Sequence, residues 1–195
     1  MPSPTLGRQH LVLLGLRASG KSTIGAQVAA RLGVPFVDLD VRTAARLHGA
    51  TVKEAFVSAG EPAFRAAEAA ELLRALDEPP QVIALGGGTP TAPGAAASLR
   101  QAQSDGRAFL VFLDPPLSVL ADRLGLDAGD RPSLTGAGVV AEIEEVARTR
   151  RPLYAALADL RFLEPLPTEA LVSIITSQVG SDADSAGAGP DALAP

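Results

Sequence analysis

The sequence has no cysteine and only two histidines, His10 and His48, among its 195 residues. The absence of cysteine excludes disulfides, thiolate catalysis and cysteine-based metal sites, and two histidines argue against a metal site built from imidazoles. Lysine is equally scarce: the chain has two lysines, Lys21 and Lys53, and fifteen arginines. A lysine that persists where arginine is so strongly preferred marks a position with a specific task.

The chain also lacks long apolar runs and an excess of positive charge. No segment approaches the ~18 uninterrupted apolar residues of a membrane span, and residues 1–10 lack the charged start and apolar run of a secretory signal. With 22 acidic and 17 basic residues the net charge is −5, which argues against electrostatic binding of nucleic acid. We expect a cytoplasmic monomer whose partners are neither membranes nor nucleic acid.

Short apolar runs alternate with segments of helical character, and hydrophobic residues make up 47% of the chain. This pattern predicts an α/β fold, a three-layer sandwich around a five-stranded parallel sheet. The expected strands are 10–15, 34–38, 82–85, 108–113 and 160–163, and the expected helices are 21–32, 51–59, 61–76, 117–124, 139–150 and 168–176. Residues 1–176 are expected to form one domain. Residues 125–138 are expected to form a mobile loop and residues 177–195 a disordered tail.

A phosphate-binding loop follows the first expected strand. Residues 15–22, GLRASGKS, fit the pattern G-x-x-x-x-G-K-[ST] between a strand and a helix. The glycines let backbone N–H groups surround phosphate oxygens, and the helix N-terminus adds a positive dipole end. Lys21 would reach the β- and γ-phosphates and the Ser22 hydroxyl would bind Mg²⁺, which makes ATP the expected nucleotide. The residues expected to bind it here are Arg17, Ala18, Ser19, Gly20, Lys21, Ser22 and Thr23.

Two aspartates stand at the end of the second expected strand. Asp38 and Asp40 are two positions apart, and a pleated strand places such residues on one face, about 6.6 Å apart. One carboxylate would then lie near the metal and the other near an acceptor hydroxyl. The alternative is a pair of solvated acids in a loop.

Two further segments have both a structural and a functional interpretation. Glu61, Arg65 and Glu68 share a helix face, where a surface ladder of ion pairs is the simpler reading. Gly86–Gly88 directly follow an expected strand and either form a tight turn or let a ligand approach the backbone closely.

Taken together, these segments resemble the shikimate kinase family over residues 10–164. The motifs that carry the resemblance occur in the order GLRASGKSTIG, FVDLD, GEPAFRAAE, ALGGGT, DRPSL and RTRRPLY. The resemblance implies a compact phosphate-loop kinase of the nucleoside-monophosphate-kinase type, with a helical substrate-binding part and a lid. It also implies the activity, transfer of the γ-phosphate of ATP to the 3-hydroxyl of shikimate, with Mg²⁺ as cofactor.

The resemblance assigns the acceptor site residue by residue. Asp40 matches the carboxylate that contacts the acceptor hydroxyls and acts as base, and Arg65 matches an arginine that holds the shikimate carboxylate. Gly86, Gly87 and Gly88 match the glycines that approach the ring hydroxyls. Arg150 matches a second carboxylate-binding arginine, with its neighbour Arg151 as the alternative.

The nucleotide side is assigned in the same way. Asp38 matches the carboxylate on the magnesium side, and Arg131 matches the lid arginine that covers the phosphates, a third catalytic group beside Lys21 and Asp40. Arg123, with Pro132, resembles the positions near adenine. Glu68 matches the acid that orients the substrate arginine.

Two other functions fit parts of the pattern. One is a catalytically inactive, ligand-binding module on the same fold, which the retention of Asp40 and the three glycines disfavours. The other is a kinase for a related hydroxy acid such as gluconate, which the paired aspartates and the triple glycine disfavour. The chain departs from the family at Arg17, where a small or apolar residue is usual, and at residues 164–167, which hold no arginine near the nucleotide.

Overall fold

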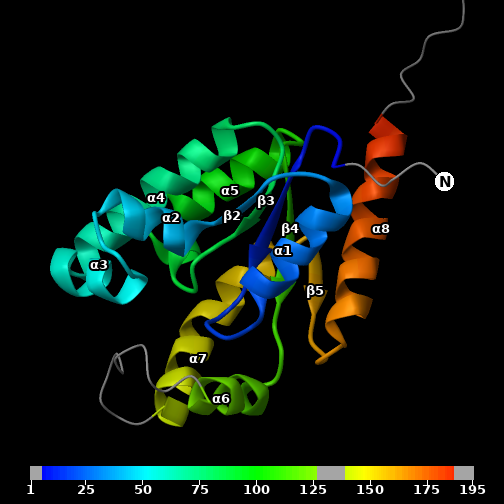
Figure 1. Ribbon diagram of the computed structural model, residues 1–195. Coiled ribbons are helices and arrows are strands. Elements are labelled where there is room, and N and C mark those ends of the chain that lie inside the picture. The colour runs from blue at the N-terminus through cyan, green and yellow to red at the C-terminus, as the bar shows by residue number, and fades with distance from the viewer. Residues whose placement is uncertain (1–5, 127–138, 187–195) are drawn as a thin grey trace, which may run out of the picture.

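A computed structural model describes residues 6–126 and 139–186 of the chain. Five strands form one sheet in the order β2-β3-β1-β4-β5, and all neighbours are parallel (Figure 1). The strands are β1 (His10–Leu14), β2 (Phe36–Asp38), β3 (Val82–Ala84), β4 (Ala108–Leu113) and β5 (Leu160–Phe162). The expected three-layer α/β architecture is confirmed.

Helices lie on both faces of this sheet. They are α1 (Lys21–Leu32), α2 (Leu39–Arg46), α3 (Val52–Ala59), α4 (Glu61–Asp77), α5 (Ala95–Ser104), α6 (Leu117–Leu126), α7 (Val139–Leu157) and α8 (Thr168–Ala186), with a short 3₁₀ turn at Thr89–Thr91. Helices α1 and α8 cover one face, and α4, α5 and α7 cover the other (Figure 1). None of the described helices combines the length and the apolar character needed to cross a membrane.

Strand β1 lies at the centre of the sheet and is buried on both sides. Leu11 and Leu13 pack into the core beneath α1 and α8, whereas Val12 and Leu14 pack into the core beneath α4, α5 and α7. All five of its residues are buried. Because both faces are covered, the strand reads as a continuous apolar run rather than an alternating one.

A smaller helical part stands at one edge of the sheet. There α2, α3 and the start of α4 enclose Ala44, Ala55 and Phe64, and the rings of Phe56 and Phe64 meet edge to face at 5.3 Å. A capping box starts α3: Thr51 accepts from the amide of Glu54, and the Glu54 carboxylate accepts from the amide of Thr51.

Two helices in the structure were not expected from the sequence, α2 and α5. Helix α2 starts directly at the end of β2, because the Asp38 side chain accepts the amides of Asp40 and Val41 and so caps it. The expectation that Asp38 and Asp40 share one face of a strand is therefore wrong. Asp38 ends the strand and Asp40 lies in the first turn of a helix.

Two helices run further than expected. Helix α7 continues from Arg150 through Pro152 to Leu157, because Tyr154 and Leu157 are buried in the core and that burial outweighs the missing proline N–H. Helix α8 continues from residue 177 to Ala186, so this part of the expected tail is helical.

The extension of α8 follows from its apolar side chains. Val172, Ile175 and Val179 keep the helical spacing and are all buried against the sheet. Residues 187–195 of the expected tail and residues 127–138 of the expected mobile loop lie outside the described residues.

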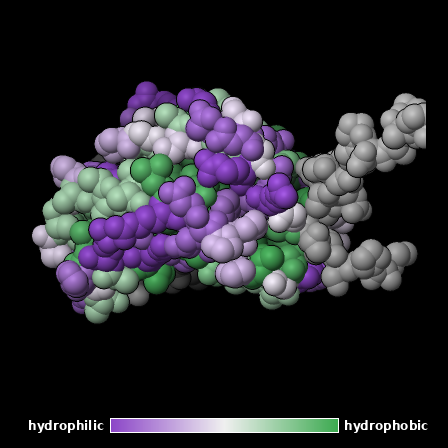
Figure 2. Space-filling view, turned by 90° about the horizontal axis from the view of Figure 1, so that it is seen from above, coloured by the Kyte–Doolittle hydropathy of each residue, from purple (hydrophilic) through white to green (hydrophobic). Residues whose placement is uncertain are grey.

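The carboxyl ends and the amino ends of the strands have different surroundings. The carboxyl ends of the strands lead into the turns near α6 and the start of α7, at the bottom of Figure 1. Figure 2 shows the molecule from above, toward the amino ends of the strands, where hydrophilic side chains break up the hydrophobic areas. Ligands of parallel α/β sheets bind at the carboxyl ends of the strands, which places the expected ligand site at that end.

Candidate active site

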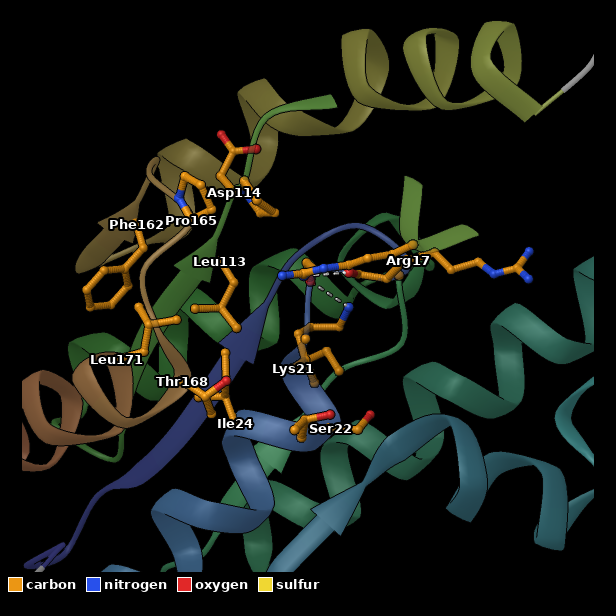
Figure 3. A pocket seen from close by; sticks show the side chains of 18 of the residues that line it. Arg17, Lys21, Ser22, Ile24, Leu113, Asp114, Phe162, Pro165, Thr168 and Leu171 are labelled. Carbon is orange, nitrogen blue, oxygen red and sulfur yellow. Dashed lines mark hydrogen bonds between the residues drawn. The ribbon is translucent and has the colours of Figure 1, made fainter. Parts of the chain in front are cut away.

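A pocket of about 740 Å³ opens at the carboxyl end of the sheet. Its walls come from the phosphate loop after β1 and from the segments that follow β2, β3, β4 and β5. Figure 3 shows Arg17 at one end, Phe162, Pro165 and Leu171 at the other, and Lys21 between them. Ligands bind parallel α/β sheets at this edge, where the connections of neighbouring strands diverge.

The phosphate loop has the backbone shape that an anion site requires. Gly20 is the N-cap of α1 with φ of 98°, a conformation that side chains rarely adopt, and no side chain caps the helix. Ser22 and Thr23, in the first turn of α1, line the pocket, so the positive end of the helix dipole lies at the pocket.

Lys21 is buried and folds back over the loop. Its Nζ donates to the carbonyl oxygens of Gly15 at 2.9 Å and Leu16 at 2.8 Å, and more weakly to the Ser19 hydroxyl at 3.3 Å. Only 8% of the residue is exposed. The ammonium is thus held at the position where the loop would surround a phosphate.

Ser22 and Asp38 meet at the floor of the pocket. The Ser22 hydroxyl donates to Asp38 Oδ2 at 2.5 Å, so the end of β2 and the start of α1 are joined. A hydroxyl and a carboxylate are hard oxygen donors, and Mg²⁺ commonly uses one or two protein oxygens with water and phosphate oxygens. The pair therefore fits Mg²⁺. Among the described residues there is no group of three or more His, Asp or Glu that could hold a metal ion.

An added Cβ at Gly86 or Gly88 would force neighbouring side chains to move, and one at Gly87 would be tight against the phosphate loop. A Cβ at Gly86 would be 2.1 Å from Asp40 Oδ1, and one at Gly88 would be 2.2 Å from Nη1 of Arg65. A Cβ at Gly87 would be 3.1 Å from the backbone nitrogen of Arg17 in the phosphate loop. Asp40, Arg65 and the phosphate loop therefore all lie close to these glycines, and the approach of a ligand to them stays a prediction.

Arg65 pairs with both acids of the expected ladder, with the exposed Glu61 at 3.3 Å and with the buried Glu68. Its Nη1 donates to Glu68 Oε2 at 2.6 Å, and Thr89 donates to the other Glu68 oxygen at 2.7 Å, while Glu68 is fully buried. Burial lowers the pKa of Arg65, but the charge and hydrogen bond of Glu68 outweigh it, and the net pKa is raised. Arg65 thus stays a cation, oriented by Glu68 from one turn away on α4.

The adjacent arginines of α7 lie in different surroundings. Arg150 Nη1 donates to the carbonyl oxygen of Gly87 at 2.7 Å. Arg151 instead pairs with Asp114 at 2.6 Å and donates to the carbonyl of Pro115 at 2.7 Å. Of the two candidates, only Arg150 is at the glycines.

The sequence placed residues 164–167 near the nucleotide but did not indicate the apolar wall at the end of the pocket away from Arg17. The walls of this end include Leu113, Phe162, Pro165, Thr168 and Leu171, from β4, β5, the segment before α8 and the first turn of α8 (Figure 3). A wall made mostly of apolar side chains suits a nucleotide base. The available signal was a strand end followed by a proline-containing turn, whose one charged residue, Glu164, does not indicate a base-binding wall.

Besides Arg17, the sequence predicted Arg123 and Arg131 on the nucleotide side. Arg123 comes from α6, lines the pocket, and donates from Nη1 to the carbonyl oxygen of Ala18 at 3.0 Å. Arg131 and Pro132 lie outside the described residues.

Comparison with known proteins agrees with this arrangement. A model of the shikimate kinase family matches residues 17–179. The shikimate kinase of Rhodopirellula baltica is 41% identical over 161 residues, which cover 78% of this chain and 80% of that relative. The shikimate kinase from Acinetobacter baumannii, solved in complex with shikimate, has a TM-score of 0.79 at 26% identity and covers 89% of this chain and 94% of its own.

The wider fold is shared with other kinases. A gluconokinase from Sinorhizobium meliloti has a TM-score of 0.55 at 17% identity and covers 92% of this chain and 95% of its own, which is a likeness of fold alone. The family match, in contrast, spans most of the chain, including the phosphate loop from Arg17 onward, the charged helix α4 and the triple glycine. On this evidence the chain belongs to the shikimate kinase family.

Proposed function

We propose that the protein is an ATP-dependent shikimate kinase, which phosphorylates the 3-hydroxyl of shikimate in aromatic amino-acid biosynthesis. The observation that carries this is the convergence of Asp40, Arg65 and Arg150 on the Gly86–Gly88 segment, which packs on the phosphate loop. A hydroxylated acid bound there would lie directly beside the phosphates of a bound nucleotide.

The acceptor half suits a small carboxylic acid with ring hydroxyls. Arg65 and Arg150 are proposed to bind the carboxylate, because a guanidinium matches a carboxylate with paired donors. Gly86, Gly87 and Gly88 are proposed to lie against the ring. Asp40 is proposed to accept the proton of the 3-hydroxyl as its oxygen bonds to the γ-phosphorus and the bond to the bridging oxygen of ADP breaks.

The nucleotide half suits the triphosphate of ATP. The residues proposed to bind ATP are Arg17, Ala18, Ser19, Gly20, Lys21, Ser22, Thr23, Arg123 and Arg131. Ser22 and Asp38 are proposed to hold Mg²⁺, which when bound neutralises charge on the phosphate oxygens. Lys21 would leave the carbonyls of its own loop for the β- and γ-phosphates, and Arg131 would stabilise the migrating group.

The wider setting is part of the same proposal. The protein is proposed to be a cytoplasmic monomer in which residues 1–176 act as one domain, together with the continuation of α8 to Ala186. The net charge of −5 supports small-molecule substrates rather than nucleic acid as partners.

The test is ADP release by the purified protein with MgATP and a panel of acceptors. We expect turnover with shikimate well above the rate without an acceptor, and no comparable turnover with gluconate. Saturable binding of shikimate without ADP release would instead support an inactive binding module. Preferential turnover with gluconate would support the alternative function, a kinase for a related hydroxy acid.

The two lysines provide a matched pair for the same assay. Lys21→Met is expected to lower kcat at least about 100-fold, because the buried ammonium that neutralises the phosphates is lost. Lys53→Met is the control, since Lys53 is an exposed residue of α3. Equal activity of the two variants would contradict the role given to Lys21.

A further inference from the structure

The carbonyl oxygen of Gly87 accepts two hydrogen bonds from one helix. Arg150 Nη1 donates to it at 2.7 Å and the Tyr154 hydroxyl at 2.8 Å, from positions one turn apart on α7. The segment that carries this carbonyl also lies against Asp40 at Gly86 and against Arg65 at Gly88. A shift of the Gly87 peptide group would therefore move the backbone against which Asp40, Arg65 and Arg150 are placed.

Arg150 has two possible partners that differ in charge. In the structure it is bonded to a neutral carbonyl, whereas a bound acceptor would offer it a carboxylate, and charge-assisted hydrogen bonds are about twice as strong as neutral ones. A guanidinium that turns to the carboxylate weakens or leaves its bond to Gly87. The carbonyl then depends on its second donor.

Tyr154 is this second donor, and its surroundings keep its hydroxyl at the Gly87 carbonyl. Its side chain is fully buried, with its ring edge to face against Phe112 of β4 at 5.7 Å, so it has little freedom to turn away. Burial raises the pKa of Tyr154 to about 12, which keeps the hydroxyl protonated and able to donate at neutral and alkaline pH.

We propose that Tyr154 is a positioning residue for the acceptor site: it holds the Gly87 carbonyl while Arg150 exchanges that carbonyl for the carboxylate of the acceptor. This inference rests on the proposed function, because it takes shikimate as the acceptor. It gives the tyrosine of α7 a task that packing alone would not require, since phenylalanine would fill the same space without the hydroxyl.

The first test is Tyr154→Phe in the acceptor assay. We expect the shikimate KM to rise about tenfold, the change expected when one buried carbonyl loses its remaining donor. The KM for ATP should stay within about twofold, because the lost bond is on the acceptor side. Ile175→Val is the control for lost stability, since it removes a buried methylene in the other core, and both KM values should then stay unchanged.

The second test uses the fact that Tyr154 is the only tyrosine of the chain. Protein produced with 3-fluorotyrosine carries a single ¹⁹F label, on the ring whose hydroxyl donates to Gly87. We expect its resonance to shift when shikimate saturates the site, because the carbonyl loses its bond to Arg150. MgADP alone should move it much less.

The outcomes separate the two proposals. If the unmodified enzyme shows no shikimate-dependent turnover, the proposed function fails. If it turns shikimate over, but Tyr154→Phe leaves the shikimate KM unchanged or raises both KM values together, Tyr154 has only a structural role. The same conclusion follows if the fluorine resonance does not respond to shikimate.

Discussion

At the scale of single residues, the acceptor site depends on the absence of side chains at Gly86 and Gly88. Gly86 and Gly88 leave space that the Asp40 carboxylate and the Arg65 guanidinium already fill, since an added Cβ would lie 2.1 and 2.2 Å from them. Arg65 in turn is oriented by Glu68, which has no contact with water. A buried carboxylate held by a cation fixes the direction of that cation's remaining donors.

Arg65→Lys tests whether this orientation serves recognition. A lysine keeps the charge beside Glu68 but replaces a planar fork with a single ammonium. We expect the shikimate KM to rise at least about tenfold, with an unchanged KM for ATP and a loss of stability under about 1 kcal/mol. Kinetics with both substrates varied, together with thermal unfolding, would measure these changes.

Arg74→Lys is the matched control, on the same helix and half exposed beside Glu71. It should leave both KM values as they are. A rise in shikimate KM for Arg74→Lys as large as for Arg65→Lys would mean that α4 as a whole, rather than the Arg65 fork, is being disturbed.

The sequence identified most charged residues of the site but could not separate Arg150 from Arg151. Successive residues of an α-helix point about 100° apart, so which of two neighbours faces the glycines depends on the rotation of α7 about its axis. That rotation is set by the burial of Tyr154 and Leu157, beyond Arg150, where the helix was predicted to end. Pro165 lines the pocket but is uncharged, so its type and position did not mark it as a site residue.

At the scale of elements, helix α2 links the metal side of the site to the acceptor side. It begins at the cap formed by Asp38 and carries Asp40 in its first turn. It is tied to α4 by Arg42, whose Nε donates to Glu71 at 2.8 Å and whose Nη1 donates to Glu78 at 2.9 Å. The helix was missed because its start is not an apolar run but a side-chain cap, and its polar side bonds to another helix.

The Arg42–Glu78 contact predicts a loss of stability in acid. Its hydrogen bonds to Arg42 and Gln81 lower the pKa of Glu78 from 4.5 to about 2. Because the folded pKa is lower than the unfolded one, the stabilisation is fully present above about pH 4.5 and disappears as the pH falls toward 2. With 38% of the Glu78 side chain exposed, solvent screening keeps its size near that of a surface pair, at most about 1 kcal/mol.

Glu78→Gln provides the measurement, by urea unfolding at neutral pH and at about pH 3. The variant is expected to be less stable than the wild type at neutral pH, and the difference should shrink at the lower pH. In an Arg42→Gln background the same substitution should change little at either pH. A stability difference that grows as the pH falls would show that the sign of the linkage is wrong.

At the scale of the whole molecule, the alternation of apolar runs and helical segments was enough to predict a parallel sheet between two helical layers. The order β2-β3-β1-β4-β5 was not predictable in this way. Which strands become neighbours is decided by how the helices pack over each face, and those contacts join residues far apart in the chain. Leu13 of β1 and Ile175 of α8, for example, belong to one core.

The cores on the two faces of the sheet support different properties of the protein. The core beneath α4, α5 and α7 contains Tyr154 and so supports the acceptor site. The core beneath α1 and α8 contains Ile175, which is fully buried, next to Ile174, which is 43% exposed. Ile175→Ala is expected to lower the free energy of unfolding by about 2–4 kcal/mol, and Ile174→Ala by under about 1 kcal/mol.

Below the unfolding transition, both variants should keep the wild-type KM for shikimate, because the cavity opens on the face of the sheet away from Arg150 and Gly87. Denaturant unfolding and initial rates on the same preparations measure the two quantities. If Ile175→Ala raised the shikimate KM in proportion to the stability lost, the two cores would form one coupled unit. The separation of folding from acceptor binding across the sheet would then be wrong.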